Sequence, residues 1–170
     1  VYRNSEGIKD VDTLFTILED CAARVYSVSP RKQGFRESPL WEVEKAEMTS
    51  KLRDTITALE EKCKDWVPIQ LEAKFGIDEP FGIDIGTEKV LVRGTIDRVD
   101  KNPSGEIQVI DYKSGGSNLS KSDLINGRRL QITIYALAAQ NALCYGNVVD
   151  GFYWVIGGKQ NQYLQLSSFE

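Results

Sequence analysis

The chain has 170 residues, of which 41% are hydrophobic, and it carries a formal net charge of −4. This size and composition fit one globular domain with its own core, and no apolar run is long enough for a membrane-spanning helix. The acidic balance disfavours a broad nucleic-acid-coating surface, and the lack of histidine excludes imidazole catalysis and imidazole ligation of zinc.

The three cysteines, Cys21, Cys63 and Cys144, are widely separated and form no Cys-x-x-Cys pair. This spacing disfavours a structural zinc site and is typical of reduced thiols in a cytoplasmic protein. The N-terminus lacks signal-peptide character and an initiator methionine. We therefore expect residues 1–170 to be a single domain that is a fragment of a larger cytoplasmic protein.

Two helices are predicted in the first part of the chain. Apolar residues at helical spacing predict a helix over residues 12–26, and the polar segment 29–38, with Pro30 and Gly34, predicts a loop. Ser38-Pro39 is typical of a helix start, and an apolar stripe from Trp41 to Trp66 predicts a long helix that Pro68 must limit.

The remainder alternates strands and helices. Strands are predicted at 69–75, 81–85 (or part of a hairpin), 90–99 and 106–112, the last two antiparallel across a turn at 101–105. A short helix at 120–126, a long helix at 128–143 and an aromatic strand at 151–156 follow, with 162–166 pairing with that strand. The order predicts an α/β fold with a mixed central sheet flanked by helices, which the last strand rejoins by a helical crossover.

The strongest chemical signal is Asp111-Tyr112-Lys113, at the end of an apolar strand. Residues two apart on a strand share a face, and burying a carboxylate beside an amine is costly unless both have a task. The predicted turn brings Asp97 beside Asp111. Two carboxylates, a lysine and the Tyr112 carbonyl suit Mg²⁺-dependent phosphodiester cleavage, in which lysine positions water or neutralises charge.

Three ordered motifs resemble the PD-(D/E)XK nuclease superfamily, in the form found in RecB/AddB-like nuclease domains. They are Gly94-Thr95-Ile96-Asp97-Arg98-Val99-Asp100, Val109-Ile110-Asp111-Tyr112-Lys113-Ser114-Gly115 and Leu130-Gln131-Ile132-Thr133-Ile134-Tyr135-Ala136. The resemblance implies an αβββαβ core, Mg²⁺ or Mn²⁺ as cofactor, DNA as substrate, and a role in DNA repair or recombination beside other domains or subunits of a helicase–nuclease. It implies that Asp97 and Asp111 bind metal, that Lys113 is catalytic, and that Gln131 and Tyr135 support the site.

The chain departs from this pattern at two points. Relatives often carry a histidine or glutamate ligand on the first core helix; Glu44, about 60° from the Trp41 stripe, is one substitute, and Glu72 in the first strand is its rival. Some relatives hold an iron–sulfur cluster with four cysteines, which this chain cannot supply, so we expect none. Lys121, Arg128 and Arg129 are candidate DNA-binding residues, because residues 113–131 hold four basic side chains and one acidic one. For Arg128 and Arg129 a further reason is that a basic pair opening a helix is unfavourable for its dipole.

Each residue also has an ordinary structural explanation. Asp111 and Lys113 could be an exposed pair, Asp97 a partner of Arg98, and Glu44 a solvated helix residue. Gln131 and Tyr135 could form a helix edge. Two other functions therefore stay open: a catalytically inactive nuclease-like module that binds DNA or acts as a scaffold, and a plain protein-interaction domain.

Overall fold

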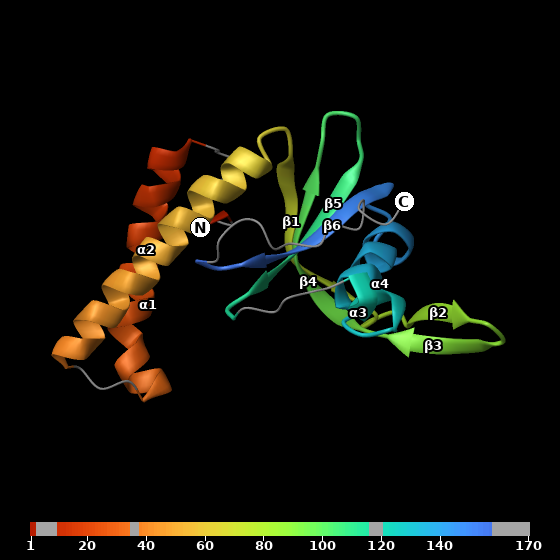
Figure 1. Ribbon diagram of the computed structural model, residues 1–170, viewed down its shortest axis with the longest axis horizontal. Coiled ribbons are helices and arrows are strands. Elements are labelled where there is room, and N and C mark those ends of the chain that lie inside the picture. Colours follow the sequence, from red (N-terminus) through yellow and green to blue (C-terminus); the bar gives the residue numbers. More distant parts are fainter. Residues whose placement is uncertain (3–9, 35–37, 116–120, 158–170) are drawn as a thin grey trace. The chain divides into compact units, whose positions relative to one another are not determined.

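The computed structural model describes residues 1–2, 10–34, 38–115 and 121–157 (Figure 1). The chain divides into two compact units, Val1–Lys64 and Asp65–Glu170. The first unit holds two helices, α1 (Val11–Gln33) and α2 (Pro39–Lys62), whose buried contacts include Leu14, Leu18 and Ile56. Within the described residues, no helix is long and apolar enough to cross a membrane.

Helix α1 is longer than the sequence predicts. It begins after Asp10, whose carboxylate accepts a hydrogen bond from the Thr13 amide at 2.9 Å. It continues through Pro30 to Gln33, so the loop predicted from residue 29 is wrong over its first five positions. Pro30 lies inside the helix and lacks the amide that would bond to the carbonyl four residues earlier. The helix ends three residues later, before Gly34, whose φ of 73° suits a C-terminal cap.

Helix α2 starts where the sequence predicts. The Ser38 hydroxyl accepts a hydrogen bond from the Trp41 amide at 3.3 Å, and Pro39 occupies the first helical position. Of the predicted stripe, Trp41, Ile56 and Leu59 are buried, whereas Met48 is exposed and Trp66 lies beyond the helix. The helix ends at Lys62, before the predicted limit at Pro68.

A four-stranded sheet forms the centre of the second unit, in the order β1-β4-β5-β6. Its strands are β1 (Val67–Phe75), β4 (Gly94–Lys101), β5 (Ile107–Lys113) and β6 (Val148–Val155). Strand β4 is antiparallel to β1 and β5, whereas β6 is parallel to β5 after a helical crossover. The predicted mixed sheet is therefore confirmed.

A hairpin interrupts the predicted strand 90–99. Strands β2 (Phe81–Ile85) and β3 (Glu88–Val92) pair as a separate two-stranded sheet. Arg93 belongs to neither β3 nor β4, so the predicted strand is interrupted there. The break coincides with a close approach to Gly76, where a Cβ would lie 2.2 Å from the Val92 carbonyl oxygen. Alternation predicts one strand here because hydrophobicity alone carries no signal for a change of partner.

The crossover between β5 and β6 contains two short helices, α3 (Lys121–Ile125) and α4 (Gln131–Leu137). Helix α4 continues into a π-helical turn, η2 (Ala138–Ala142). The predicted start at Arg128 is wrong, because Arg129 has a φ of 56° and cannot belong to a right-handed helix. Both arginines precede the helix, so its dipole gives no reason to assign them to phosphate. The strand predicted at 162–166 lies outside the described residues.

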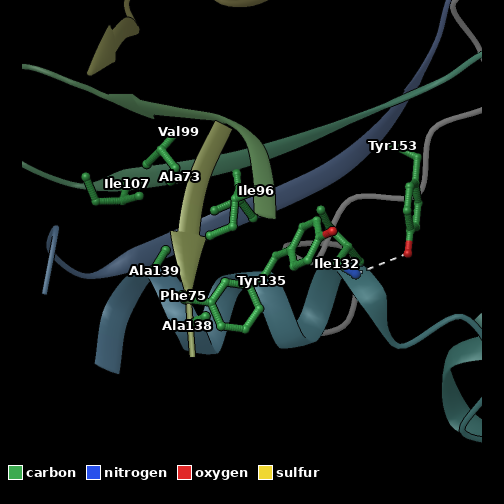
Figure 2. Close-up of a cluster of buried hydrophobic side chains, with 11 residues drawn as sticks. Ala73, Phe75, Ile96, Val99, Ile107, Ile132, Tyr135, Ala138, Ala139 and Tyr153 are labelled. Atoms are coloured by element: carbon green, nitrogen blue, oxygen red, sulfur yellow. Dashed lines mark hydrogen bonds between the residues drawn. The ribbon is translucent and has the colours of Figure 1, made fainter. Parts of the chain in front are cut away.

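The core of the second unit lies between the sheet and α4 (Figure 2). Ile96 and Val99 of β4 both belong to this buried cluster, although three positions separate them. In a regular strand, residues an odd number apart face opposite sides, so the alternation of β4 changes between them. Asp97 lies within this stretch. Asp97 lies opposite Glu72 of β1, because the neighbours of Glu72 pair with Arg98 and Ile96. Glu72 has a φ of 51°.

Candidate active site

Strands β4 and β5 part at Asp97. Their pairing runs from Lys101 and Ile107 to Arg98 and Ile110, whereas β5 continues beside β6 as far as Lys113. Beyond this point a side chain joins the two strands in place of backbone pairing: the Asp97 carboxylate accepts a hydrogen bond from the Tyr112 amide at 2.8 Å. The Asp97 side chain therefore lies beside the end of β5, as the predicted turn between these strands requires.

Asp111 and Lys113 form an ion pair at the end of β5, between Asp111 Oδ2 and Lys113 Nζ. The Asp111 side chain is 3% exposed and that of Lys113 is 31% exposed, so the carboxylate is enclosed and the lysine side chain is partly accessible to solvent. The pair is thus not the exposed surface pair of the ordinary explanation.

The pair Gln131–Tyr135 joins this group from α4. Gln131 Oε1 accepts a hydrogen bond from Lys113 Nζ at 2.7 Å, and Gln131 Nε2 donates to the Tyr135 hydroxyl at 2.7 Å. The Tyr135 ring packs edge-on against Phe75, with ring centroids 5.9 Å apart. A Cβ at Gly94 would lie 3.0 Å from the Phe75 ring, which accounts for glycine at the start of the first motif.

Burial is the main electrostatic influence on Asp111. It raises the pKa of this carboxyl, the ion pair with Lys113 opposes the rise, and the charge of Asp97 adds to it. Two carboxylates that repel each other in a partly buried site favour the approach of a cation, and their oxygens suit a hard ion such as Mg²⁺ or Mn²⁺. Across the described parts of the chain, no three Asp, Glu, Cys or His side chains form a ligand group, so other oxygen donors would have to complete the pair.

The two predicted additional ligands lie in different units. Glu72 is exposed on β1 opposite Asp97, at the irregular position described above. Glu44 is exposed on α2 of the first unit. Their metal-binding roles, like that of the Tyr112 carbonyl, stay predictions.

A pocket of about 290 Å³ opens beside Lys113. It is lined by Lys113, Ser114, Gly115, Arg129, Gln131 and Tyr153. Of the predicted DNA-binding residues, Arg129 is exposed and lines this pocket, Arg128 is exposed beside it in sequence, and Lys121 begins α3. Their DNA contacts stay predictions.

Tyr153 of β6 is a site residue that sequence reasoning missed. The sequence suggests only core and edge positions for residues 152–154, and Tyr153 is indeed buried, with 6% exposure. It also lies beside Asp111 in the parallel register, and Lys113 Nζ lies 5.0 Å from its ring centroid. Burial raises the pKa of its hydroxyl, which keeps the group protonated. No local signal marks it, because its neighbours depend on the pairing of β6 with β5.

Comparison with known proteins shows which family this chain resembles. The family model for the PD-(D/E)XK nuclease superfamily matches residues 2–168. The chain is 34% identical to the B subunit of the ATP-dependent helicase/deoxyribonuclease of Clostridium novyi over 126 residues, which is 69% of this chain and 10% of that protein. The corresponding protein of Clostridium tetani is 35% identical over 101 residues, 52% of this chain and 9% of that protein.

The corresponding protein of Symbiobacterium thermophilum is 38% identical over 80 residues, 42% of this chain and 7% of that protein. The chain thus spans about a tenth of the length of these relatives, and the similarity concerns one region of each. The match to the family model covers nearly the whole chain, and the ordered motifs carry the side chains that the fold brings together. This chain belongs to the PD-(D/E)XK nuclease superfamily.

Proposed function

We propose that this chain is a Mg²⁺- or Mn²⁺-dependent deoxyribonuclease domain. The observation that carries the proposal is the meeting of Asp97, Asp111 and Lys113 where β4 and β5 part, with Gln131 holding the lysine. Carboxylates beside a lysine that lines a pocket fit phosphoryl transfer to water better than they fit a structural ion pair.

In this proposal Asp97 and Asp111 hold the metal ion, with the Tyr112 carbonyl and either Glu72 or Glu44 as further candidate oxygen donors. When bound, the ion supplies positive charge that neutralises the phosphate and polarises its oxygens. The Asp111 carboxylate suits this task because burial removes it from competing water, and its neighbour Asp97 doubles the negative charge offered to the ion.

Lys113 orients the attacking water and neutralises charge on the phosphate. Asp111 and Gln131 fix its ammonium from two sides, so little motion is needed when the transition state forms. The water oxygen forms a bond to phosphorus as the bond to the leaving oxygen breaks, the water proton passes to solvent, and the leaving oxygen takes up a proton from solvent. No covalent enzyme intermediate is required.

DNA would lie along the basic residues next to the site. Arg129 lines the same pocket as Lys113, and exposed guanidinium groups suit contacts with phosphate oxygens. Arg128 and Lys121 are further candidates in the same crossover. Gln131 and Tyr135 support the site and contact the DNA backbone.

The biological context is also a proposal. Residues 1–170 would form one nuclease domain of a larger helicase–nuclease or another DNA repair or recombination protein. The support is the similarity to the three helicase/deoxyribonuclease proteins described above, of which this chain spans about a tenth.

The test is cleavage of end-labelled single- and double-stranded DNA with Mn²⁺, comparing wild type with Asp111→Asn. The matched control is Asp84→Asn, an exposed carboxylate on the β2–β3 hairpin. Wild type and the control should cleave at similar rates, and Asp111→Asn should lose activity. DNA binding without cleavage by the wild type would instead support the inactive DNA-binding or scaffolding module. A wild type that neither binds nor cleaves DNA would refute both functions.

A further inference from the structure

The hydroxyl of Tyr153 joins the N-terminus of α4 to the turn that precedes it, and Figure 2 shows its contact with Ile132. It accepts a hydrogen bond from the Ile132 amide at 3.1 Å and donates one to the Arg129 carbonyl at 3.1 Å. The residue before α4, Leu130, provides no side-chain cap. Tyr153 therefore satisfies an amide that a capping serine or aspartate would ordinarily bind.

The turn at Arg129 needs such a constraint. Its φ of 56° lies in the left-handed region, which is unfavourable for a residue with a long side chain. Strained backbone of this kind persists when surrounding contacts determine it, and it often occurs at functional sites. Arg129 lines the same pocket as Lys113, so the Tyr153 hydroxyl contributes to the position of Arg129 beside that pocket.

The ring of Tyr153 contacts the other side of the site. Lys113 Nζ lies 5.0 Å from the ring centroid, within the range of a cation–π interaction. Strand β6 places Tyr153 directly beside Asp111 in the parallel register. The ammonium is therefore enclosed by the Asp111 carboxylate, the Gln131 amide oxygen and this aromatic face.

We propose that Tyr153 is a positioning residue for the nuclease reaction, with two separable parts. Its hydroxyl holds the Arg129 turn and the start of α4 for substrate binding, and its ring holds Lys113 for the chemical step. This inference rests on the proposed function and adds to it a residue outside the three motifs.

The two parts predict different kinetic effects. Tyr153→Phe keeps the ring and removes the hydrogen bonds, so the KM for DNA should rise about fivefold to tenfold while kcat stays within about threefold. Tyr153→Leu also removes the aromatic face, and kcat should then fall by about tenfold or more.

Phe152→Leu is the matched control. Phe152 is the adjacent buried aromatic residue on β6, outside the core cluster that contains Tyr153, and it makes a ring contact with Trp154. The substitution removes the same kind of ring from the same strand without touching Lys113. Its kcat and KM per folded molecule should stay within about twofold of wild type. Equal losses in Phe152→Leu and Tyr153→Leu would reduce the tyrosine to a packing residue and overturn the proposal.

A second measurement requires no activity. Amide hydrogen exchange of Ile132 should be at least about tenfold faster in Tyr153→Phe than in Phe152→Leu, because only the first variant removes its acceptor. Equal exchange rates of the Ile132 amide in the two variants would refute the role of the Tyr153 hydroxyl in positioning α4. If the wild type cleaves no DNA, the proposed function fails, and this exchange measurement still decides whether Tyr153 positions the helix.

Discussion

A buried ion pair lies next to Asp97 on β4, and its contribution to the stability of the strand that carries Asp97 can be measured. Arg98 Nε and Nη2 donate to the two carboxylate oxygens of Asp100 at 2.6 and 2.8 Å, and both side chains are fully buried. Gln108 Nε2 donates to the same carboxylate at 3.2 Å. We predict that removing only the carboxylate, in Asp100→Ala, will strongly destabilise the second unit.

The magnitude follows from burial. A guanidinium cannot lose its charge in a protein, so Asp100→Ala leaves a cation inside the protein without this bidentate acceptor. Breaking one partner of a buried pair costs about 3–5 kcal/mol, a large part of a typical stability of about 5–15 kcal/mol. In urea this corresponds to a midpoint lower by about 2 M, for a slope of about 2 kcal/mol per molar.

The double variant Arg98→Met/Asp100→Leu separates the cost of a stranded charge from the loss of packing. Because it removes both charges together, it should be at least about 1 kcal/mol more stable than Asp100→Ala. The matched control is Asp84→Ala, which breaks the exposed pair with Lys89 at 3.6 Å and should cost no more than about 1 kcal/mol.

The assay is urea unfolding of the 170-residue chain, monitored by circular dichroism. A cost below about 1 kcal/mol for Asp100→Ala would mean that the Arg98 charge finds water or another acceptor, and that burial does not set the cost of losing its partner. A double variant that is no more stable than Asp100→Ala would contradict the stranded-charge explanation independently.

Three further predictions concern the site and its supporting helices. Millimolar Mg²⁺ or Mn²⁺ should raise the thermal midpoint of the wild type by mass action, and Asp111→Asn should abolish most of the shift; a wild type that does not respond counts against the metal site. Lys113→Ala should slow Mn²⁺-dependent DNA cleavage about 10²–10⁴-fold per folded molecule, and equal rates would exclude a catalytic role. Ser38→Ala should lower the stability of the first unit by about 0.5–2 kcal/mol in chemical unfolding, since the Trp41 amide loses its cap; an unchanged midpoint would contradict the capping contact.

Local rules were sufficient for much of the fold. Ser38 and Pro39 mark the start of α2 because a cap and a first-turn proline act within a few residues of each other. The turn between β4 and β5 could be predicted in the same way, and with it the nearness of Asp97 to the end of β5. The order of the family motifs identified Lys113 and Gln131 as candidates, and the structure brings them into hydrogen-bond contact.

The longer-range features were decided by tertiary packing. The strand break at Arg93 follows from a change of pairing partner, and the delayed start of α4 accompanies the left-handed turn at Arg129. Tyr153 meets Lys113 because β6 pairs in parallel with β5 in one particular register. Composition and alternation specify which side of a strand is apolar, but the choice of neighbouring strand and its register depends on burying the whole core at once, so residues far apart in sequence become neighbours only in the folded chain.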